Sequence, residues 1–320
     1  MKPNFICLGF SKCGTTTLSE LLRQHKDIYM PTIKEPIFFS ENEFYKKGED
    51  WYEKRYYSGA KKQKAIGEVN PLLTAFNHSD RICRYFDKNT KVIFMMRNPV
   101  EKAYSFFKMF VRDGILQNEI FLSDQFNLKK SFEKYVIRNC AKGKAVKNMI
   151  ISQGEYYKVM LPYIKYFGKE NIKFILFEDM VADTEGTLRD VEDFLGISHA
   201  DYIDFNVESN EGQKIPKVQI YPAIRRKLKM LRYWIVRHTE NKADPWIAFI
   251  FGDILHITFP TPEIQACVKK IKHLLHISKK KNKKIPMSSK SRKVLEDYYR
   301  EDKKKVEKLL DRSLDDLWFK

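Results

Sequence analysis

The stretch that decides the fold is GFSKCGTTTL, residues 9–18. Its two glycines, Gly9 and Gly14, stand five positions apart directly after a short apolar run, and Lys12 lies between them. Glycine allows the backbone to curl closely around an anion, and the first amides of a helix point toward that anion. We therefore predict a strand, a phosphate-binding loop and then a helix that begins near Thr15.

The predicted loop supplies several groups that bind an anion: loop amides, one ammonium group and three hydroxyls. The residues concerned are Lys12, Cys13, Gly14, Thr15, Thr16 and Thr17. A nucleoside triphosphate loop carries its lysine directly after the second glycine, followed by a hydroxyl ligand for magnesium. Here the lysine stands at the loop apex instead. We therefore expect an anionic ligand and predict no metal site.

A second candidate anchor is RNPVEKAYSFF, residues 97–107, which follows the apolar run at 91–96. Pro99 suits the first turn of a helix, and Ser105 then stands about two turns along it. An arginine at the carboxyl end of a parallel strand lies at the edge where ligands collect. The guanidinium of Arg97 can grip a phosphate with two parallel hydrogen bonds, and a structural ion pair is the alternative.

The rest of the chain alternates strand and helix patterns. Apolar runs rich in β-forming residues occur at 4–9, 65–69, 91–96 and 172–177. The residues between these runs show helical periodicity. This alternation indicates an α/β fold, in which helices cover both faces of a mostly parallel sheet.

The composition changes toward the end of the chain. We expect one domain over 1–320, whose core with the anion site covers 1–217. Basic and aromatic residues alternate at 218–286, which we interpret as a helical insertion on the acceptor side. The last segment, 287–320, is predicted to form a helical C-terminal region that packs back on the core, because isolated helices need such burial to persist.

The charge balance indicates anionic partners. The chain has 59 Lys and Arg against 41 Asp and Glu, a formal net charge of +18. Five cysteines form no metal-like or CxxC pattern, which favours a reducing compartment. The first eight residues do not resemble a secretory signal, and no apolar run reaches the roughly 20 residues that span a bilayer. We therefore expect a cytoplasmic protein, with peripheral membrane contact left open.

With both anchors in view, the sequence resembles the sulfotransferases that use 3'-phosphoadenosine 5'-phosphosulfate (PAPS), nearer to the carbohydrate and heparan-sulfate type. FSKCGTTTL resembles the 5'-phosphosulfate loop of that family, and RNPVEKAYS resembles its 3'-phosphate motif. Further segments agree in the same order: KEPIFF at 34–39, GEVNPLL at 67–73 and 151–180. The ending at 285–318 resembles the bacterial branch.

The resemblance implies a P-loop-like three-layer sandwich and a mechanism without metal. It implies that Arg97 and Ser105 bind the 3'-phosphate of PAPS, and that Lys12 and the threonines bind the 5'-phosphosulfate. A later loop resembles the segment that folds over the nucleotide, where Lys214 and Lys217 can reach a phosphate or be plain surface charge.

For the acceptor, the resemblance implies that Glu35 is the general base and that Lys12 stabilises the departing phosphate. Glu68 is the competing base, and His78 is a weaker one. At places where heparan-sulfate enzymes often carry a histidine, an acidic residue and a lysine, this chain departs from the family pattern. It has Ile37, Ser40 and Val69 there, so heparan sulfate itself is not implied.

We therefore expect a sulfotransferase that moves a sulfuryl group from PAPS to a hydroxyl of a carbohydrate or glycolipid, an anionic one being compatible with the charge. One alternative is a P-loop nucleotide kinase, in which Glu178 and Asp179 would coordinate magnesium. Another is a basic protein that binds nucleic acid or anionic membrane. The ordered loop and arginine motifs favour the enzyme, so no nucleic-acid partner is expected.

Overall fold

A computed structural model describes residues 1–75, 77–112, 116, 127–140, 148–200, 203–205 and 285–319. The described residues divide into two compact units. The first takes its residues from Met1–Ala103, Cys140–Asn210 and Lys293–Lys320. The second takes them from Tyr104–Asn139 and Glu211–Arg292. The single domain expected over 1–320 stays a prediction, and the expected insertion at 218–286 lies outside the described residues except for its last two.

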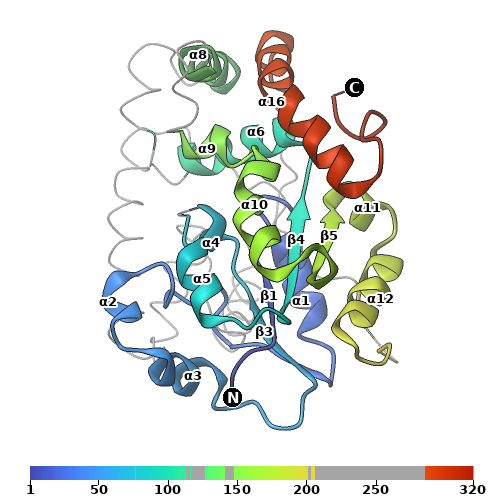
Figure 1. Ribbon diagram of the computed structural model, residues 1–320. Helices are drawn as coiled ribbons and strands as arrows, with labels where there is room; N and C mark the ends of the chain where they lie inside the picture. Colours follow the sequence, from blue (N-terminus) through green and yellow to red (C-terminus); the bar gives the residue numbers. More distant parts are fainter. Residues whose placement is uncertain are drawn as a thin grey trace, which may run out of the picture. The chain divides into compact units, whose positions relative to one another are not determined.

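The first unit is built on a parallel sheet of five strands in the order β2-β3-β1-β4-β5 (Figure 1). The strands are β1 (Phe5–Cys7), β2 (Ile28–Tyr29), β3 (Ala65–Val69), β4 (Lys91–Met96) and β5 (Ile172–Leu176). The four runs predicted from the sequence all form strands. The short edge strand β2 was not predicted, because two residues are too few to form a recognisable pattern.

The register aligns the ends of β1 and β3, and β4 continues three residues further to Met96. Cys7 at the end of β1 stands opposite Val69 of β3 and Ile93 of β4. All residues of β1 and β3 are buried, as expected for a parallel sheet that is covered on both faces. After β1 the chain forms β2 and β3 on one side of β1, and then β4 and β5 on the other side. The end of β1 is therefore the switch point, where ligands bind in such sheets.

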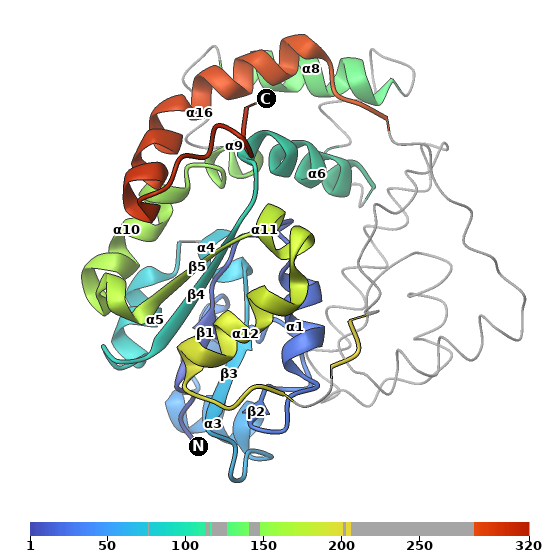
Figure 2. The ribbon, with the colours of Figure 1, turned by 90° about the vertical axis from the view of Figure 1, so that its right-hand side faces the viewer.

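Helices cover both faces of this sheet. Figure 2 shows α4, α5 and α10 on one face and α1 and α12 on the other. The helices that lie within the first unit are α1 (Thr15–Leu22), α2 (Asn42–Tyr45), α3 (Glu49–Tyr57), α4 (Leu72–Ala75), α5 (Ser79–Tyr85), α9 (Met149–Ser152), α10 (Tyr156–Phe167), the 3-10 turn η2 (Lys169–Asn171), α11 (Phe177–Ala182) and α12 (Thr184–Leu195). The predicted α/β sandwich with a parallel sheet is confirmed.

The second unit contains helix-to-helix packing through aromatic rings. Helix α6 (Pro99–Arg112) begins in the first unit and continues into the second, where it meets α8 (Leu128–Cys140). The ring of Phe132 lies 4.8 Å from Tyr104 and 4.9 Å from Phe107 between centroids. Such pairs stabilise helix contacts beyond the buried area itself.

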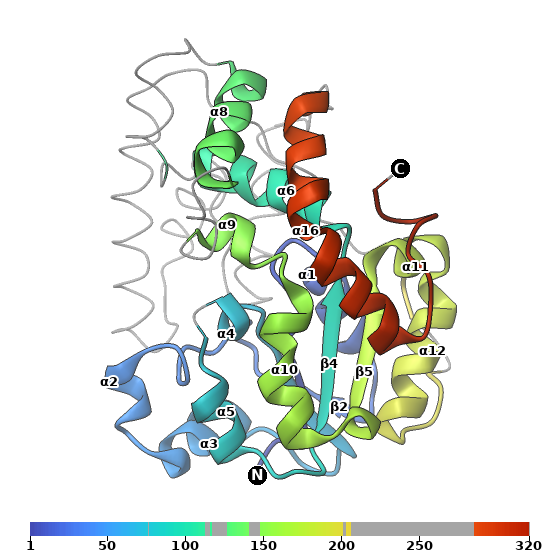
Figure 3. The same cartoon turned by 45° about the horizontal axis from the view of Figure 1, so that its top comes forward.

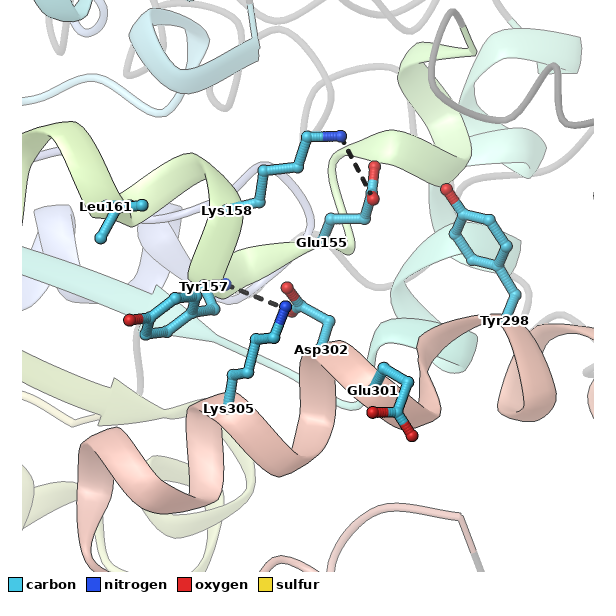
Figure 4. Close-up of a pocket in the computed structure, with 8 residues that line it drawn as sticks. All are labelled: Glu155, Tyr157, Lys158, Leu161, Tyr298, Glu301, Asp302 and Lys305. Atoms are coloured by element: carbon cyan, nitrogen blue, oxygen red, sulfur yellow. Dashed lines mark hydrogen bonds and ion pairs between the residues drawn. The ribbon is translucent and has the colours of Figure 1, made fainter.

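The predicted C-terminal helix is confirmed as α16 (Ser289–Leu310). From Lys293 onward it belongs to the first unit and lies beside α10 (Figure 3). Tyr299 donates a 2.7 Å hydrogen bond to the carbonyl of Ile151. Asp302 accepts one of 3.2 Å from the backbone amide of Tyr157, at the start of α10 (Figure 4). A carboxylate beside the start of a helix also interacts favourably with the positive end of the helix dipole.

We predict that Tyr299→Phe lowers the free energy of unfolding by about 1 kcal/mol, because the Ile151 carbonyl loses its side-chain donor and keeps only the amide of Gly154. Urea unfolding followed by circular dichroism measures this. Tyr157→Phe is the matched control, since no hydrogen bond of the Tyr157 hydroxyl is present in the described part of the chain, and it should change stability little. Equal losses in the two variants would contradict the role given to the Tyr299 hydroxyl.

Candidate donor site at the sheet edge

The quoted glycine loop connects β1 to α1, as predicted. Gly14 adopts a left-handed backbone with φ 89° and immediately precedes α1. A Cβ at this position would lie 2.8 Å from the ring of Phe177, so both the backbone angle and the close packing on α11 require glycine. Gly9 is required for a different reason: a Cβ added at this position would lie 2.4 Å from the backbone nitrogen of Met95 on the neighbouring strand.

The loop apex and the start of α1 present the expected groups. Lys12 has a φ of 70°, a left-handed conformation that is uncommon for a residue other than glycine. Cys13 is buried, and its thiol lies 3.7 Å from the hydroxyl of Tyr156. Its amide donates to the carbonyl of Phe10 within the loop. Of the threonines, Thr15 is buried, whereas Thr16 and Thr17 are partly exposed.

Arg97 follows β4 directly and meets the loop. Its guanidinium donates a 3.4 Å hydrogen bond to the carbonyl of Lys12. The same group lies 4.6 Å from the ring centroid of Phe177, a cation–π contact that orients it. The structure therefore brings the guanidinium of Arg97 to the backbone of Lys12, a residue 85 positions earlier in the sequence.

The backbone at Arg97 is held by side chains from two helices. The hydroxyl of Tyr156, on α10, donates to the Arg97 carbonyl at 2.6 Å and accepts from the Arg97 amide at 3.3 Å. The amide of Asn98 donates to Oε1 of Glu178, on α11, at 2.8 Å. We call Tyr156 and Glu178 the backbone clamp of the strand end.

Glu35 is held near the loop by its neighbours. Lys34 donates a 2.7 Å hydrogen bond to the hydroxyl of Thr16 and forms an ion pair of 3.4 Å with Glu35. On the other side, Asn70 donates a 2.8 Å hydrogen bond to the carbonyl of Pro36. Glu35 has a φ of 60°, and such left-handed residues occur where surrounding contacts enforce them, often at functional sites.

Glu68, the competing base, is enclosed. Its side chain is 1% exposed. Tyr52 and Tyr57 donate to Oε2 at 2.7 and 2.9 Å, and Asn70 donates to Oε1 at 3.0 Å. Burial raises the pKa of Glu68 to about 7, and the three donors lower it in part. Because Asn70 also binds the Pro36 carbonyl, Glu68 supports the segment that carries Glu35.

Lys102 lies behind the loop, on the first turns of α6. It is fully buried, and its ammonium group lies 5.8 Å from the ring centroid of Phe10 and 5.7 Å from that of Tyr156. Burial lowers the pKa of Lys102 to about 7. The Cys13 thiol, in turn, has its pKa raised by burial to about 11, so it is a poor nucleophile.

The remaining predicted residues are distributed as follows. Ser105 lies on α6, in the part that belongs to the second unit, and is partly exposed. Lys214 and Lys217 lie outside the described residues. His78 precedes α5, and burial lowers its pKa. Their proposed roles stay predictions.

Sequence reasoning missed three kinds of residue: the bridging Lys34, the amide of Asn70 and the clamp side chains Tyr156 and Glu178. Lys34 and Asn70 stand within one or two positions of the singled-out glutamates, which was a usable signal. Tyr156 gave no such signal, and Glu178 was named only as a magnesium ligand of the kinase alternative, because the clamp role arises only when α10 and α11 meet the end of β4.

The carboxylates of the kinase alternative have other partners. Glu178 binds the Asn98 amide, and Asp179 accepts two hydrogen bonds from Arg312 at 2.5 and 3.1 Å. Within the described ranges, no group of three His, Cys, Asp or Glu side chains is placed to hold a metal ion. In the same part of the chain, no helix has the length and apolar character needed to cross a membrane.

A parallel sheet with a glycine loop at its switch point and an arginine at the next strand end defines a P-loop-like α/β architecture, whose loop amides and helix start suit an anionic ligand. Residues 2–219 match the sulfotransferase domain family, and the chain belongs to this family. The predicted resemblance is therefore confirmed.

Relatives and a solved structure agree with this assignment. The chain is 27% identical to the membrane-associated sulfotransferase kil1 of Dictyostelium discoideum, over 63% of this chain and 58% of that protein. It is 31% identical to heparan sulfate glucosamine 3-O-sulfotransferase 3B1 of Mus musculus, over 61% of this chain and 46% of that protein. The chain thus spans about half the length of these curated relatives.

A sulfotransferase from Alicyclobacillus acidocaldarius has a similar fold, with a TM-score of 0.51 and 24% identity over 81% of this chain and 98% of that one.

We predict that Glu68→Gln changes the pH dependence of stability. A carboxyl whose folded-state pKa is raised to about 7 adds stability that is complete below about 4.5 and is lost as the pH rises through 7. Between pH 5 and pH 8, the free energy of unfolding of the variant should therefore rise relative to that of the wild type by on the order of 3 kcal/mol. Urea unfolding at both pH values measures this.

The exposed Glu49→Gln, which removes no buried carboxyl, is the control and should not reproduce a change of this size. A pH-independent difference for Glu68→Gln would show that the buried carboxyl has no raised pKa.

Proposed function

We propose that the protein is a sulfotransferase that transfers a sulfuryl group from PAPS to a hydroxyl of a carbohydrate or glycolipid, without a metal ion. The observation that carries the proposal is the meeting of Lys12, Arg97 and the Lys34–Glu35 pair at one glycine loop. Membership of the sulfotransferase family supports the reaction class.

The donor side follows from the positions of the charges. In this proposal the amides that begin α1, together with Lys12 and the threonine hydroxyls, bind the 5'-phosphosulfate. Arg97, held at the loop from the next strand, binds the 3'-phosphate, with Ser105 further along α6. Cations at both ends match a donor that carries negative charge at both ends.

The transfer itself needs a base and a stabilised leaving group. The acceptor oxygen attacks the sulfur and forms a new S–O bond, while its proton passes to the carboxylate of Glu35. The bond between sulfur and the bridging phosphate oxygen breaks, and its electron pair stays on that oxygen. Lys12 stabilises the charge that develops there. The products are a sulfate ester and 3'-phosphoadenosine 5'-phosphate.

Exposure favours Glu35 over Glu68 as the base. The side chain of Glu35 is 30% exposed and lies beside Lys34, which reaches the loop. Glu68 is buried, and both its oxygens accept hydrogen bonds from neighbouring side chains. A base must reach the acceptor hydroxyl to take its proton, so we assign Glu35 this role and give Glu68 a supporting one.

The carbohydrate acceptor is proposed from the relatives. One of them is named as a heparan sulfate sulfotransferase and another as carbohydrate sulfotransferase 15. The net charge of +18 is compatible with an anionic glycan. A screen of candidate glycans and glycolipids with radiolabelled PAPS tests this, and transfer to simple phenols alone would overturn it.

We predict that the purified protein binds 3'-phosphoadenosine 5'-phosphate and that Arg97→Ala weakens this binding at least tenfold, because charge-assisted hydrogen bonds to the phosphate are lost. Arg97→Lys should recover part of the loss, since lysine keeps the charge but not the paired donors. Isothermal titration calorimetry measures the affinities. If the wild type does not bind the nucleotide, or if Arg97→Ala leaves the affinity unchanged, the donor assignment is refuted.

We predict that Glu35→Gln lowers kcat about 100-fold or more while leaving the affinity for 3'-phosphoadenosine 5'-phosphate near that of the wild type. Radiolabelled sulfuryl transfer and calorimetry measure the two quantities. Glu49→Gln, an exposed glutamate on α3, is the matched control and should keep full activity. If Glu35→Gln stays active while Glu68→Gln is inactive with intact nucleotide binding, the base is Glu68.

A further inference from the structure

The segment that follows α16, residues 311–319, contacts the donor side of the first unit. Trp318 is 1% exposed, and its indole nitrogen donates to Oε2 of Glu178 at 3.4 Å. Its ring lies 5.7 Å from that of Tyr156 between centroids. Trp318 therefore contacts both members of the backbone clamp, although neither the donor motifs nor the base assignment involves it.

The contacts of the clamp form a continuous chain to the donor site. Tyr156 and Glu178 hold the amides of Arg97 and Asn98 and the carbonyl of Arg97. These peptide groups lie between β4 and α6, where the backbone sets the direction of the Arg97 side chain. A shift of either clamp residue therefore moves the guanidinium relative to the loop.

A second contact docks the same segment on α11. Arg312 donates two hydrogen bonds to Asp179, the residue next to Glu178. This ion pair is about half exposed, so solvent screens it and it contributes little by itself. Trp318 is the buried member of the segment, and its hydrogen bond to the partly buried Glu178 is less exposed to solvent than the ion pair of Arg312.

The other face of α11 contacts the donor loop. Phe177, which precedes Glu178, packs against the position of Gly14 and beneath the guanidinium of Arg97. Three consecutive residues of α11 thus make different contacts. Phe177 contacts the donor loop, Glu178 contacts the end of β4, and Asp179 contacts the docked segment.

We propose that Trp318 is a positioning residue of the donor site: by contacting Glu178 and Tyr156, it fixes the peptide groups that direct Arg97. The inference rests on the proposed function for the identity of the ligand. It goes beyond that function because it assigns a role to a residue more than 200 positions after the donor motifs.

The test compares Trp318→Phe with Tyr299→Phe. Each substitution keeps an aromatic ring and removes one buried hydrogen-bond donor from the C-terminal part of the first unit. Only Trp318 touches the clamp. Trp318→Phe should raise the Kd for 3'-phosphoadenosine 5'-phosphate about tenfold, or about 1.4 kcal/mol, whereas Tyr299→Phe should leave it unchanged.

Hydrogen–deuterium exchange gives a readout that needs no ligand. The peptide that covers 94–103 should exchange faster in Trp318→Phe than in the wild type, because the amides of Arg97 and Asn98 are then held less firmly. In Tyr299→Phe its exchange should match the wild type. Unchanged exchange and affinity in Trp318→Phe, or equal changes in both variants, would overturn the proposal.

Glu178→Gln provides a second route if Trp318→Phe does not fold. It weakens the hydrogen bonds that Glu178 accepts from the Asn98 amide and from Trp318. It should therefore raise both the Kd and the exchange rate, as Trp318→Phe does. In the double variant the losses should not add, because both residues act through one contact. Additive losses would count against the proposal.

The two proposals fail in different ways. If the wild type does not bind 3'-phosphoadenosine 5'-phosphate, the donor assignment fails, and the role of Trp318 in that site fails with it. If the wild type binds normally and Trp318→Phe binds equally well, only the role of Trp318 is overturned.

Discussion

The parallel pairing of β1 with both β3 and β4 is the constraint on which the rest of the first unit depends. Cys7 stands level with Val69, so β1 and β3 end together, and β4 runs on to Met96 beside the loop residues Leu8 and Phe10, whose amides donate to the carbonyls of Ile93 and Met95. The glycine loop leaves β1 there, Asn70 follows β3, and the segment that carries Arg97 follows β4. Backbone hydrogen bonds of the sheet thus bring together groups that are far apart in the sequence, before any side chain contributes.

Side chains behind this edge then determine the orientation of the charged groups. Lys12 and Glu35 both have left-handed backbones, which cost roughly 1–2 kcal/mol each and need support from their surroundings. Lys34 and Asn70 supply that support around Glu35 by binding Thr16 and the Pro36 carbonyl. The clamp does the same for the strand end beside Arg97. A buried network therefore holds the partly exposed cations and the carboxylate, so little reordering is needed when an anion binds.

The sequence was sufficient for the features that depend on local pattern. The strands at Ala65–Val69 and Lys91–Met96 matched the prediction because continuous apolar runs are typical of a sheet buried on both faces. The loop was predictable because the spacing of its glycines after an apolar run is a local signal, although the contacts with Met95 and Phe177 that require the glycines are distant in the sequence. The contacts of Glu68 with Tyr57 and of Tyr156 with Arg97 were not, since they join residues 11 and 59 positions apart in ways that no spacing reveals. The sequence left Glu68 as a competing base, and its burial, which the sequence did not reveal, is the observation behind the supporting role that we propose for it.

The measurement that tests the account most directly is a crystal structure of the protein with 3'-phosphoadenosine 5'-phosphate. The account predicts the 5'-phosphate at the amides that begin α1, beside Lys12 and the threonine hydroxyls, and the 3'-phosphate at the guanidinium of Arg97. It also predicts the Glu35 carboxylate on the side where the sulfuryl group would extend. A nucleotide bound elsewhere, or one whose phosphates contact neither the loop nor Arg97, would contradict the account.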